Sequence, residues 1–330
     1  MKSRYNLIFI IGFFIVGYGQ ETKQPDSARI VSFSDKLILK VNLDTQFDDY
    51  KIRNITDNSL LKIASNNDFR LFLSLDYEFI GASIGFSPNF FSGNVDDELK
   101  GNSSFTDYRF RFFLGNWVQG VHYSRIKGYY VENTSDYVPF WEEGTDPYLQ
   151  FPDLKSTSWG MSTAYVFNPD FSYRNVIYQT EWQKKSAGSL VPTLFYNYNR
   201  LSFSIEDASS IEDYFNIRLA IPYYYTWVLN EKWFVAPFLA PSIGIRFSKY
   251  LDTTPEGFIK SKDSYTTQAL DGGIQLGYSS RKVIFGVNLN FDVNGYKENS
   301  ETTITNDKLY GLLYFGIRLT PPKAVSKFFN

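Results

Sequence analysis

Alternation of apolar and polar residues over segments of about ten residues constrains the fold of this chain more than any other feature. In residues 36–47, for example, Leu39 and Val41 flank Lys40. Successive side chains of a β-strand point to opposite faces, so a strand with this pattern has one apolar and one polar face. Repeated segments of roughly 9–11 residues of this kind are typical of transmembrane β-barrels, whose strands are apolar toward lipid and polar toward the lumen.

The N-terminal residues predict a secretory signal peptide. Lys2 and Arg4 precede an apolar run at residues 7–16, which is too short to span a bilayer, and small residues follow before Gln20. The predicted organisation is a signal peptide at residues 1–19, a short periplasmic segment at 20–35, an outer-membrane barrel at 36–320 and a C-terminal tail at 321–330.

Composition excludes several other classes of protein. The chain has no Cys and one His, which removes lipidation, disulfides and zinc sites. We expect neither a metal nor a cofactor. A mean hydropathy of -0.27, with no later run of about 18 apolar residues, excludes a helical membrane protein. The formal net charge of -2 gives no basic excess for a nucleic acid.

The alternation predicts an all-β, antiparallel up-and-down barrel of fourteen strands. The expected strands are 36–47, 68–76, 79–88, 104–114, 117–130, 156–167, 171–184, 189–197, 200–205, 214–229, 232–248, 265–278, 282–294 and 308–319. The division at Asn197-Tyr198-Asn199 rests on the tolerance of Asn for positive φ. It also rests on the even strand number and one-sided short turns of bacterial barrels. Twelve strands is the alternative.

Short and long connections between these strands alternate. The long ones, expected on the extracellular side, are 48–67, 89–103, 131–155, 206–213, 249–264 and 295–307. Aromatic residues such as Trp117, Phe171 and Trp227 cluster at the short turns, as expected of a girdle at the membrane interface. Residues 186–189, Ser-Ala-Gly-Ser, are interpreted as a tight extracellular hairpin in which Gly188 adopts an unusual backbone angle.

Several motifs resemble one known family. They are Asn168-Pro169-Asp170-Phe171-Ser172-Tyr173-Arg174, Gln183-Lys184-Lys185-Ser186-Ala187-Gly188-Ser189, Lys127-Gly128-Tyr129-Tyr130, Asp153-Leu154-Lys155 and Phe315-Gly316-Ile317-Arg318. The chain is similar over essentially its whole mature length to an uncharacterised outer-membrane β-barrel family of the Bacteroidota, a domain of unknown function. The resemblance implies an outer-membrane barrel and assigns no activity.

Strand parity predicts a set of charged side chains that face the lumen. They are Arg70, Asp76, Asp107, Arg109, Arg111, Glu181, Arg218, Arg246, Asp271, Asp292 and Arg318. One interpretation is a polar pore whose guanidinium groups attract anionic solutes. The other, which we favour, is a ladder of ion pairs that fills the lumen, because both signs occur in similar numbers.

The long connection at residues 131–155 is a second candidate site. It mixes aromatic rings with carboxylates and prolines, and the expected contact residues for a ligand or partner are Tyr137, Trp141, Glu142, Glu143 and Tyr148. A loop of this length is usually functional, here as a binding surface or as a constriction of the mouth.

Three functions follow from these features. A porin-like channel or transporter for small solutes is the first choice, and a non-transporting barrel that anchors surface loops is close behind. A lipid hydrolase that uses His122 and Ser124, two residues apart on one strand, is a distant third. We expect no enzyme. The expected partners are outer-membrane lipids, together with small solutes or a surface or periplasmic protein.

Overall fold

The computed structural model describes residues 29–45, 49–54, 56–297 and 302–329. The predicted signal peptide, residues 1–19, lies outside the described residues.

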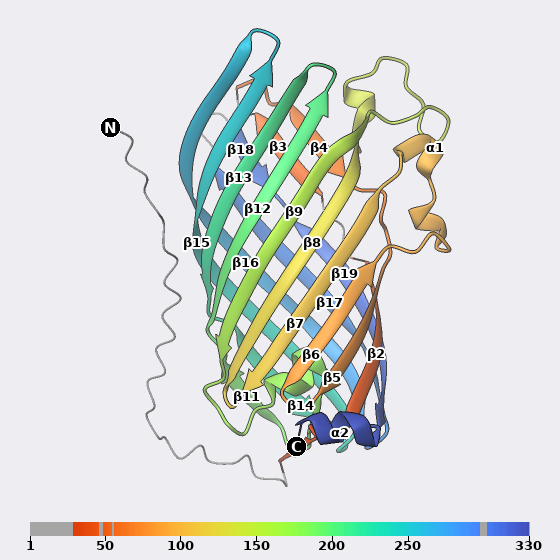
Figure 1. Ribbon diagram of the computed structural model, residues 1–330, viewed down its shortest axis with the longest axis vertical. Helices are drawn as coiled ribbons and strands as arrows, with labels where there is room; N and C mark the ends of the chain where they lie inside the picture. The colour runs from red at the N-terminus through yellow and green to blue at the C-terminus, as the bar shows by residue number, and fades with distance from the viewer. Residues whose placement is uncertain (1–28, 46–48, 55, 298–301, 330) are drawn as a thin grey trace.

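Twelve antiparallel strands form a closed wall (Figure 1). They are β2 (Leu37–Asp44), β5 (Arg70–Tyr77), β6 (Ile80–Phe86), β7 (Ser104–Leu114), β8 (Trp117–Val131), β9 (Gln150–Tyr165), β12 (Thr193–Ile205), β13 (Ala208–Ala220), β15 (Trp233–Thr254), β16 (Gly257–Ser279), β17 (Val283–Lys297) and β19 (Lys308–Leu319). Each strand pairs with the next, and β19 closes the ring by pairing with β2, with Phe315 opposite Val41. The predicted barrel class is therefore confirmed.

Two wall strands continue past a proline. β11 (Ala187–Leu190) pairs with β14 (Tyr223–Val228) in the same register as β12 with β13. Pro192 and Pro222 interrupt the two strands, where the Val191 amide still donates to the Pro222 carbonyl at 2.9 Å. β11 and β14 therefore extend β12 and β13 instead of adding strands to the ring.

A second, smaller ring of pairings lies at one end of the barrel, which we call the loop end. There β18 (Thr302–Thr305), β3 (Tyr50–Asn54) and β4 (Leu60–Ala64) link β17 to β8. β15 and β16 also continue to this end and meet at Thr254 and Gly257. The opposite end, where both termini of the described chain lie, is called the terminal end (Figure 1).

Short elements complete the fold. They are β1 (Ile30–Ser32), β10 (Glu181–Gln183), the 3₁₀ turns η1 (Ser92–Asn94) and η2 (Thr134–Asp136), the π-turn η3 (Arg174–Tyr178), and the helices α1 (Asp97–Lys100) and α2 (Lys323–Phe329). β1 pairs with β10. α2 lies across the terminal end, where the Phe329 ring packs on Tyr77 and Phe79.

None of the helices in the described ranges is long and apolar enough to cross a membrane.

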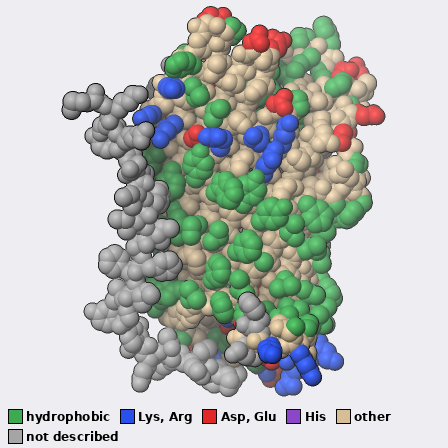
Figure 2. Space-filling model, viewed as in Figure 1, with side chains coloured by type: hydrophobic (Ala, Val, Ile, Leu, Met, Phe, Trp, Pro, Cys, Tyr) green, Lys and Arg blue, Asp and Glu red, His purple; other side chains and the backbone are tan. Residues whose placement is uncertain are grey.

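The two faces of the wall differ as the alternation predicts. On β2 and β5 the outward Val41 and Leu73 are over 40% exposed, whereas Lys40 and Asp76 are almost completely buried on the lumen side. Figure 2 shows the outward apolar side chains as a broad belt across the visible face of the barrel. A closed ring of hydrogen bonds with such a belt satisfies every requirement for crossing a bilayer.

The predicted count of fourteen strands is wrong, and the alternative of twelve is right. The stretch Asn197-Tyr198-Asn199 is no turn: β12 runs through it, with Tyr198 outward and both asparagines lining the lumen. Residues 171–184 form no wall strand either. The false turn and the false wall strand each added one strand to the predicted count. Because two extra strands leave the direction of the chain unchanged, the other strands were still predicted to run in the correct direction.

Several predicted loops are shorter than expected because strands continue beyond the apolar belt. β13 begins at Ala208, and β15 and β16 leave a connection of only residues 255–256. The connection between β8 and β9 covers residues 132–149 instead of 131–155. Residues 186–189 lie at the terminal end and begin β11 instead of forming a hairpin, and Gly188 has no positive φ.

The outward face can be tested with one charge. Replacing Val41 by Arg places a cation in the apolar belt and is expected to lower the free energy of unfolding in lipid by about 2–4 kcal/mol. The measurement is a urea titration in bilayers followed by tryptophan fluorescence. The matched control is Phe140→Arg, because Phe140 is 99% exposed in the β8–β9 loop. Equal effects of the two substitutions would contradict a lipid-facing β2.

Candidate functional site

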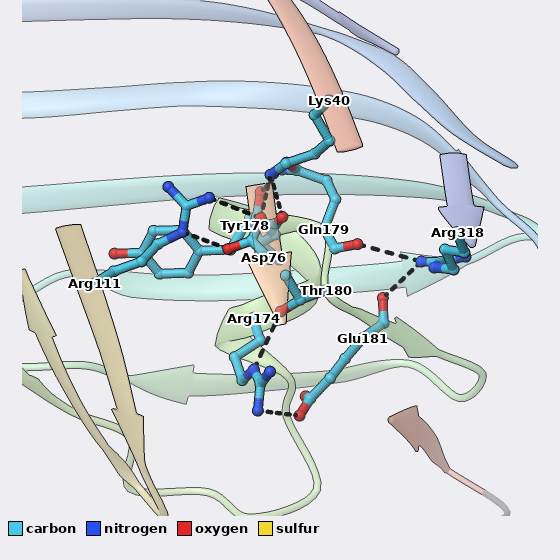
Figure 3. A network of polar contacts seen from close by, with 10 residues as sticks. Lys40, Asp76, Arg111, Arg174, Tyr178, Gln179, Thr180, Glu181 and Arg318 are labelled. Atoms are coloured by element: carbon cyan, nitrogen blue, oxygen red, sulfur yellow. Dashed lines mark hydrogen bonds and ion pairs between the residues drawn. The ribbon is translucent and has the colours of Figure 1, made fainter. Parts of the chain in front are cut away.

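Residues 169–186, which we call the internal segment, leave the wall and fold into the lumen at the terminal end (Figure 3). The wall itself is continuous across their ends, since the Asn168 side-chain amide donates to the Gly188 carbonyl at 2.8 Å. The segment is therefore an insertion between two adjacent wall positions.

Local polar contacts give the internal segment a defined shape. The Ser172 hydroxyl accepts a hydrogen bond from the Asn175 amide at 2.8 Å, at the start of the η3 turn. Gln179 ends that turn with a left-handed φ of 55°. The buried Gln183 side chain accepts from the Ser172 amide at 2.6 Å and donates to the Asp170 and Lys185 carbonyls at 2.8 Å. It thereby holds the two ends of the segment together.

Apolar packing fixes the internal segment against the wall. Phe171 and Val176 of the segment join a buried cluster with residues from six wall strands or their extensions: Phe113, Val118, Ala164, Val166, Val191, Tyr224, Phe234 and Ala236. The expectation that Phe171 belongs to the aromatic girdle is wrong. Phe171 is only 3% exposed, and its ring is stacked on that of Tyr224 with 6.2 Å between the ring centres. The terminal end of the lumen is thus a packed core.

A buried trio of charges on the wall meets the tip of the segment. Arg111 of β7 donates two hydrogen bonds of 2.7 Å to the Asp76 carboxylate of β5. The Lys40 ammonium lies 3.8 Å from Asp76, and it donates to the Gln179 side-chain oxygen at 3.1 Å and to the Tyr178 carbonyl. Such pairing is required, because an unpaired charge at this depth is costly.

Arg318 of β19 makes a second connection from the wall. Its guanidinium donates to the Gln179 carbonyl at 3.2 Å and also to the Ser280 carbonyl. The guanidinium lies 3.8 Å from the centre of the Phe33 ring, a cation–π contact. Lys40 therefore holds Tyr178 and Gln179, and Arg318 holds the Gln179 and Glu181 carbonyls, as Figure 3 shows.

One ion pair lies within the segment. Arg174 is 3.5 Å from the Glu181 carboxylate and donates to the Thr180 hydroxyl at 3.1 Å. Burial lowers the pKa of the Arg174 guanidinium, and the carboxylate of Glu181 opposes this shift. Glu181 was expected on a wall strand; it instead belongs to β10 of the internal segment.

Two cavities occupy the lumen between the segment and the loop end. The first has a volume of 290 Å³, with Tyr178 and Gln179 of the segment facing Lys40, Arg109 and Asn290 of the wall. The second has a volume of 270 Å³ and is lined by polar groups such as Asn199, Arg246 and Asp292. Polar surroundings of this size accommodate water or a small polar solute.

The other predicted lumen residues are placed in ion pairs or close contacts. The structure pairs Arg109 with Asp107 at 2.7 Å, Arg218 with Asp271 at 3.1 Å, and Arg246 with Glu212 at 2.5 Å. Arg70 lies over the Phe105 ring at 4.2 Å, and Asp292 accepts from the Asn294 side chain at 2.9 Å. In the described residues the lumen therefore holds paired charges of both signs.

Sequence reasoning left two residues of this site, Lys40 and Glu212, out of the predicted lumen-facing set. Lys40 has the correct parity on β2, and the alternation alone identifies it as lumen-facing. Glu212 was assigned to a loop because the extension of β13 beyond the belt carries no apolar pattern. Gln179 was expected to face the lumen from a wall strand; the structure places it in the lumen, but on the internal segment.

The five predicted loop residues lie at the rim. Trp141 packs on Tyr148 at 4.7 Å and donates to the Pro147 carbonyl, and the Tyr137 hydroxyl donates to the Leu60 carbonyl of β4. Burial, followed by the neighbouring Glu143 carboxylate, raises the pKa of Tyr148. Glu142 contributes its backbone to a turn closed by Asp146. Together with the Tyr148 amide, which donates to the Leu99 carbonyl of α1 at 2.9 Å, these contacts hold the loop against β4 and α1.

His122 faces a serine other than the predicted one. Its Nε2 lies 3.5 Å from the Ser158 hydroxyl of β9, whereas Ser124 is paired across the sheet with Asp107 and Ser158. In the described parts of the chain, no group of three or more His, Asp or Glu side chains is arranged to hold a metal ion.

A twelve-stranded wall with an apolar exterior and paired charges in its lumen defines a transmembrane β-barrel protein. The chain belongs to the family described as a domain of unknown function (DUF4421), whose model matches residues 24–318. No curated protein matches the chain.

Solved structures of barrel proteins show only distant likeness. The TodX deltaS2S3 mutant monoaromatic hydrocarbon channel is 9% identical with a TM-score of 0.34, over 86% of this chain and 90% of that one. Neisserial surface protein A is 11% identical with a TM-score of 0.22, over 86% and 97%. The chain spans 45% of the ferric yersiniabactin uptake receptor FyuA from Yersinia pestis, at 10% identity and a TM-score of 0.29 over 88% of this chain. Structural similarity at such low identities and TM-scores does not support any inference about function.

The buried charge trio can be compared with an exposed pair of the same chemistry. Asp76→Ala leaves Arg111 and Lys40 buried without their carboxylate and is expected to cost about 3–5 kcal/mol of stability. Asp213→Ala removes the equally bidentate partner of the half-exposed Arg200 and is expected to cost about 0.2–1 kcal/mol. Denaturant titrations of both variants in the same detergent make the comparison, and similar losses would contradict the role of the trio.

Proposed function

We propose that this protein is an outer-membrane barrel that passes small polar solutes through a lumen closed at its periplasmic end by the internal segment. The observation that carries this proposal is the position of the segment: it fills the terminal end of the lumen, while polar cavities of 290 and 270 Å³ continue above it. The segment is the obstacle between those cavities and the terminal end.

The outer-membrane location is supported by the form of the barrel. Its short turns and both termini of the described chain lie at one end, and its longer connections lie at the other. Barrels of the outer membrane have short periplasmic turns and longer extracellular loops. The terminal end is therefore assigned to the periplasm and the loop end to the cell exterior, with membrane lipids around the belt.

Polar contacts between the segment and the wall favour a closure that can open. Lys40 and Arg318 hold Gln179 through hydrogen bonds that water can replace, and the paired charges around the cavities suit solutes of either sign. The predicted porin-like channel or transporter is thereby proposed to be closed at its terminal end. We propose no enzymatic role; the hydroxyl 3.5 Å from the His122 Nε2 belongs to Ser158 and not to the predicted Ser124.

A non-transporting anchor is the second candidate, and one observation favours it. The apolar cluster around Phe171 and Val176 packs the segment as tightly as a protein core. In that case the segment serves only to stiffen the wall, and the loops at the rim carry the function.

Removal of the segment tests whether it closes the lumen. A variant with residues 169–186 replaced by a short Gly-Ser turn keeps the wall intact, because Asn168 and Gly188 are already in contact. We expect little conductance from the wild-type protein in planar bilayers and steady ion conductance from the variant. Deletion of residues 137–147 in the rim loop is the control and is expected to leave conductance low. A wild-type protein that conducts like an open pore would contradict the proposal.

A reversible crosslink separates transport from anchoring. Ser32 and Glu181 are directly paired between β1 and β10, and directly paired positions of antiparallel strands are close enough for a disulfide. The natural chain has no cysteine, so two introduced cysteines can pair only with each other. In proteoliposomes, the S32C/E181C variant is expected to admit small polar solutes when reduced and to admit at least severalfold less when oxidised. The E181C single variant is the control. Absence of uptake in both redox states would support the anchor.

A further inference from the structure

Six cations form a band on the outer surface near the loop end. This basic band consists of Arg125 of β8, Lys155 of β9, Arg200 of β12, Lys249 of β15, and Lys260 and Lys262 of β16. Register places them at neighbouring positions, with Arg125 and Arg200 both opposite Thr157, and Lys249 opposite Lys262. Figure 2 shows Lys and Arg side chains gathered directly above the apolar belt on this face.

A row of aromatic rings runs along the lower edge of the band. On the same outward face, two residues closer to the terminal end, lie Tyr123, Trp159, Tyr198, Phe215 and Phe247. Trp159 is 57% exposed and packs on Tyr123 at 4.3 Å between ring centres. Aromatic side chains of this kind occupy the boundary between hydrocarbon and headgroups. The basic band therefore lies at the depth of the lipid headgroups.

Two adjacent hollows lie along the band and share Arg200. One, of 330 Å³, combines the rings of Tyr123, Trp159 and Tyr198 with the cations of Arg125 and Lys155. The other, of 440 Å³, contains Lys249, Lys260 and Lys262. Asp213 is the single carboxylate among the residues lining either hollow, and it is paired with Arg200 at 2.6 Å. The hollows thus have a strong positive excess.

We propose that these hollows bind the phosphate-bearing headgroup of an anionic lipid in the leaflet at the loop end. The cations around each hollow supply donors for phosphate oxygens, and the rings below them pack on the adjoining apolar part of the lipid. The hollows open sideways at the edge of the belt, where a lipid headgroup is already present. This site is independent of the function proposed for the lumen.

Native mass spectrometry of the full chain in a neutral detergent tests the site. The probes are phosphatidic acid, diacylglycerol with the same acyl chains, and inorganic phosphate. We expect retention of phosphatidic acid, and about 30-fold weaker binding by the R125Q/K155Q variant, because each cation near a headgroup contributes about 1 kcal/mol. These substitutions change only exposed or half-exposed side chains.

The matched control removes two charges at the opposite end. Arg281 and Lys282 are exposed in the turn between β16 and β17, and R281Q/K282Q is expected to bind phosphatidic acid like the wild type. Equal binding of diacylglycerol, or unchanged binding by R125Q/K155Q, would overturn the proposal. Displacement of phosphatidic acid by an equal concentration of inorganic phosphate would show a site for free phosphate and would also overturn it.

Discussion

The pairing of β2 with β19 makes the rest of the structure possible. Inside a bilayer no water is present to satisfy backbone amides and carbonyls, so a sheet is stable there only when its first and last strands pair. Here the ring closes with Phe315 opposite Val41, both directed toward lipid. Once the ring is closed, the alternation along each strand assigns every side chain either to lipid or to the lumen.

The width of this ring explains the internal segment. A barrel of about eight strands is filled by its own side chains, whereas one of 16 or more leaves a water-filled channel. Twelve strands lie between these limits, and this lumen contains both kinds of interior. The terminal end is filled by residues 169–186 with an apolar core, and the remainder holds polar cavities lined by paired charges. The Asp76–Arg111–Lys40 trio lies at the boundary between them.

The two ends of the barrel have different chemistry. At the terminal end the wall strands are joined by tight turns and covered by α2. At the loop end β15 and β16 extend well beyond the belt, and β3, β4 and β18 close a second ring. The basic band lies between the belt and these extensions. The closure of the lumen involves the inner face of the wall strands, whereas the proposed lipid site lies on their outer face. The two proposals are therefore compatible with each other.

The sequence by itself determined the fold class and the face of most side chains. The alternation of apolar and polar residues along a strand can be read from neighbouring residues alone. It places Lys40, Asp76 and Arg111 on the polar faces of their strands, which line the lumen. Only the tertiary structure decided which of these charges meet. It also decided the strand number, since residues 171–184 alternate like a wall strand but satisfy their polar groups inside the barrel. Asn197 and Asn199 suit either a turn or a lumen-facing strand, and the hydrogen bonds of β9 and β13 on both sides select the strand.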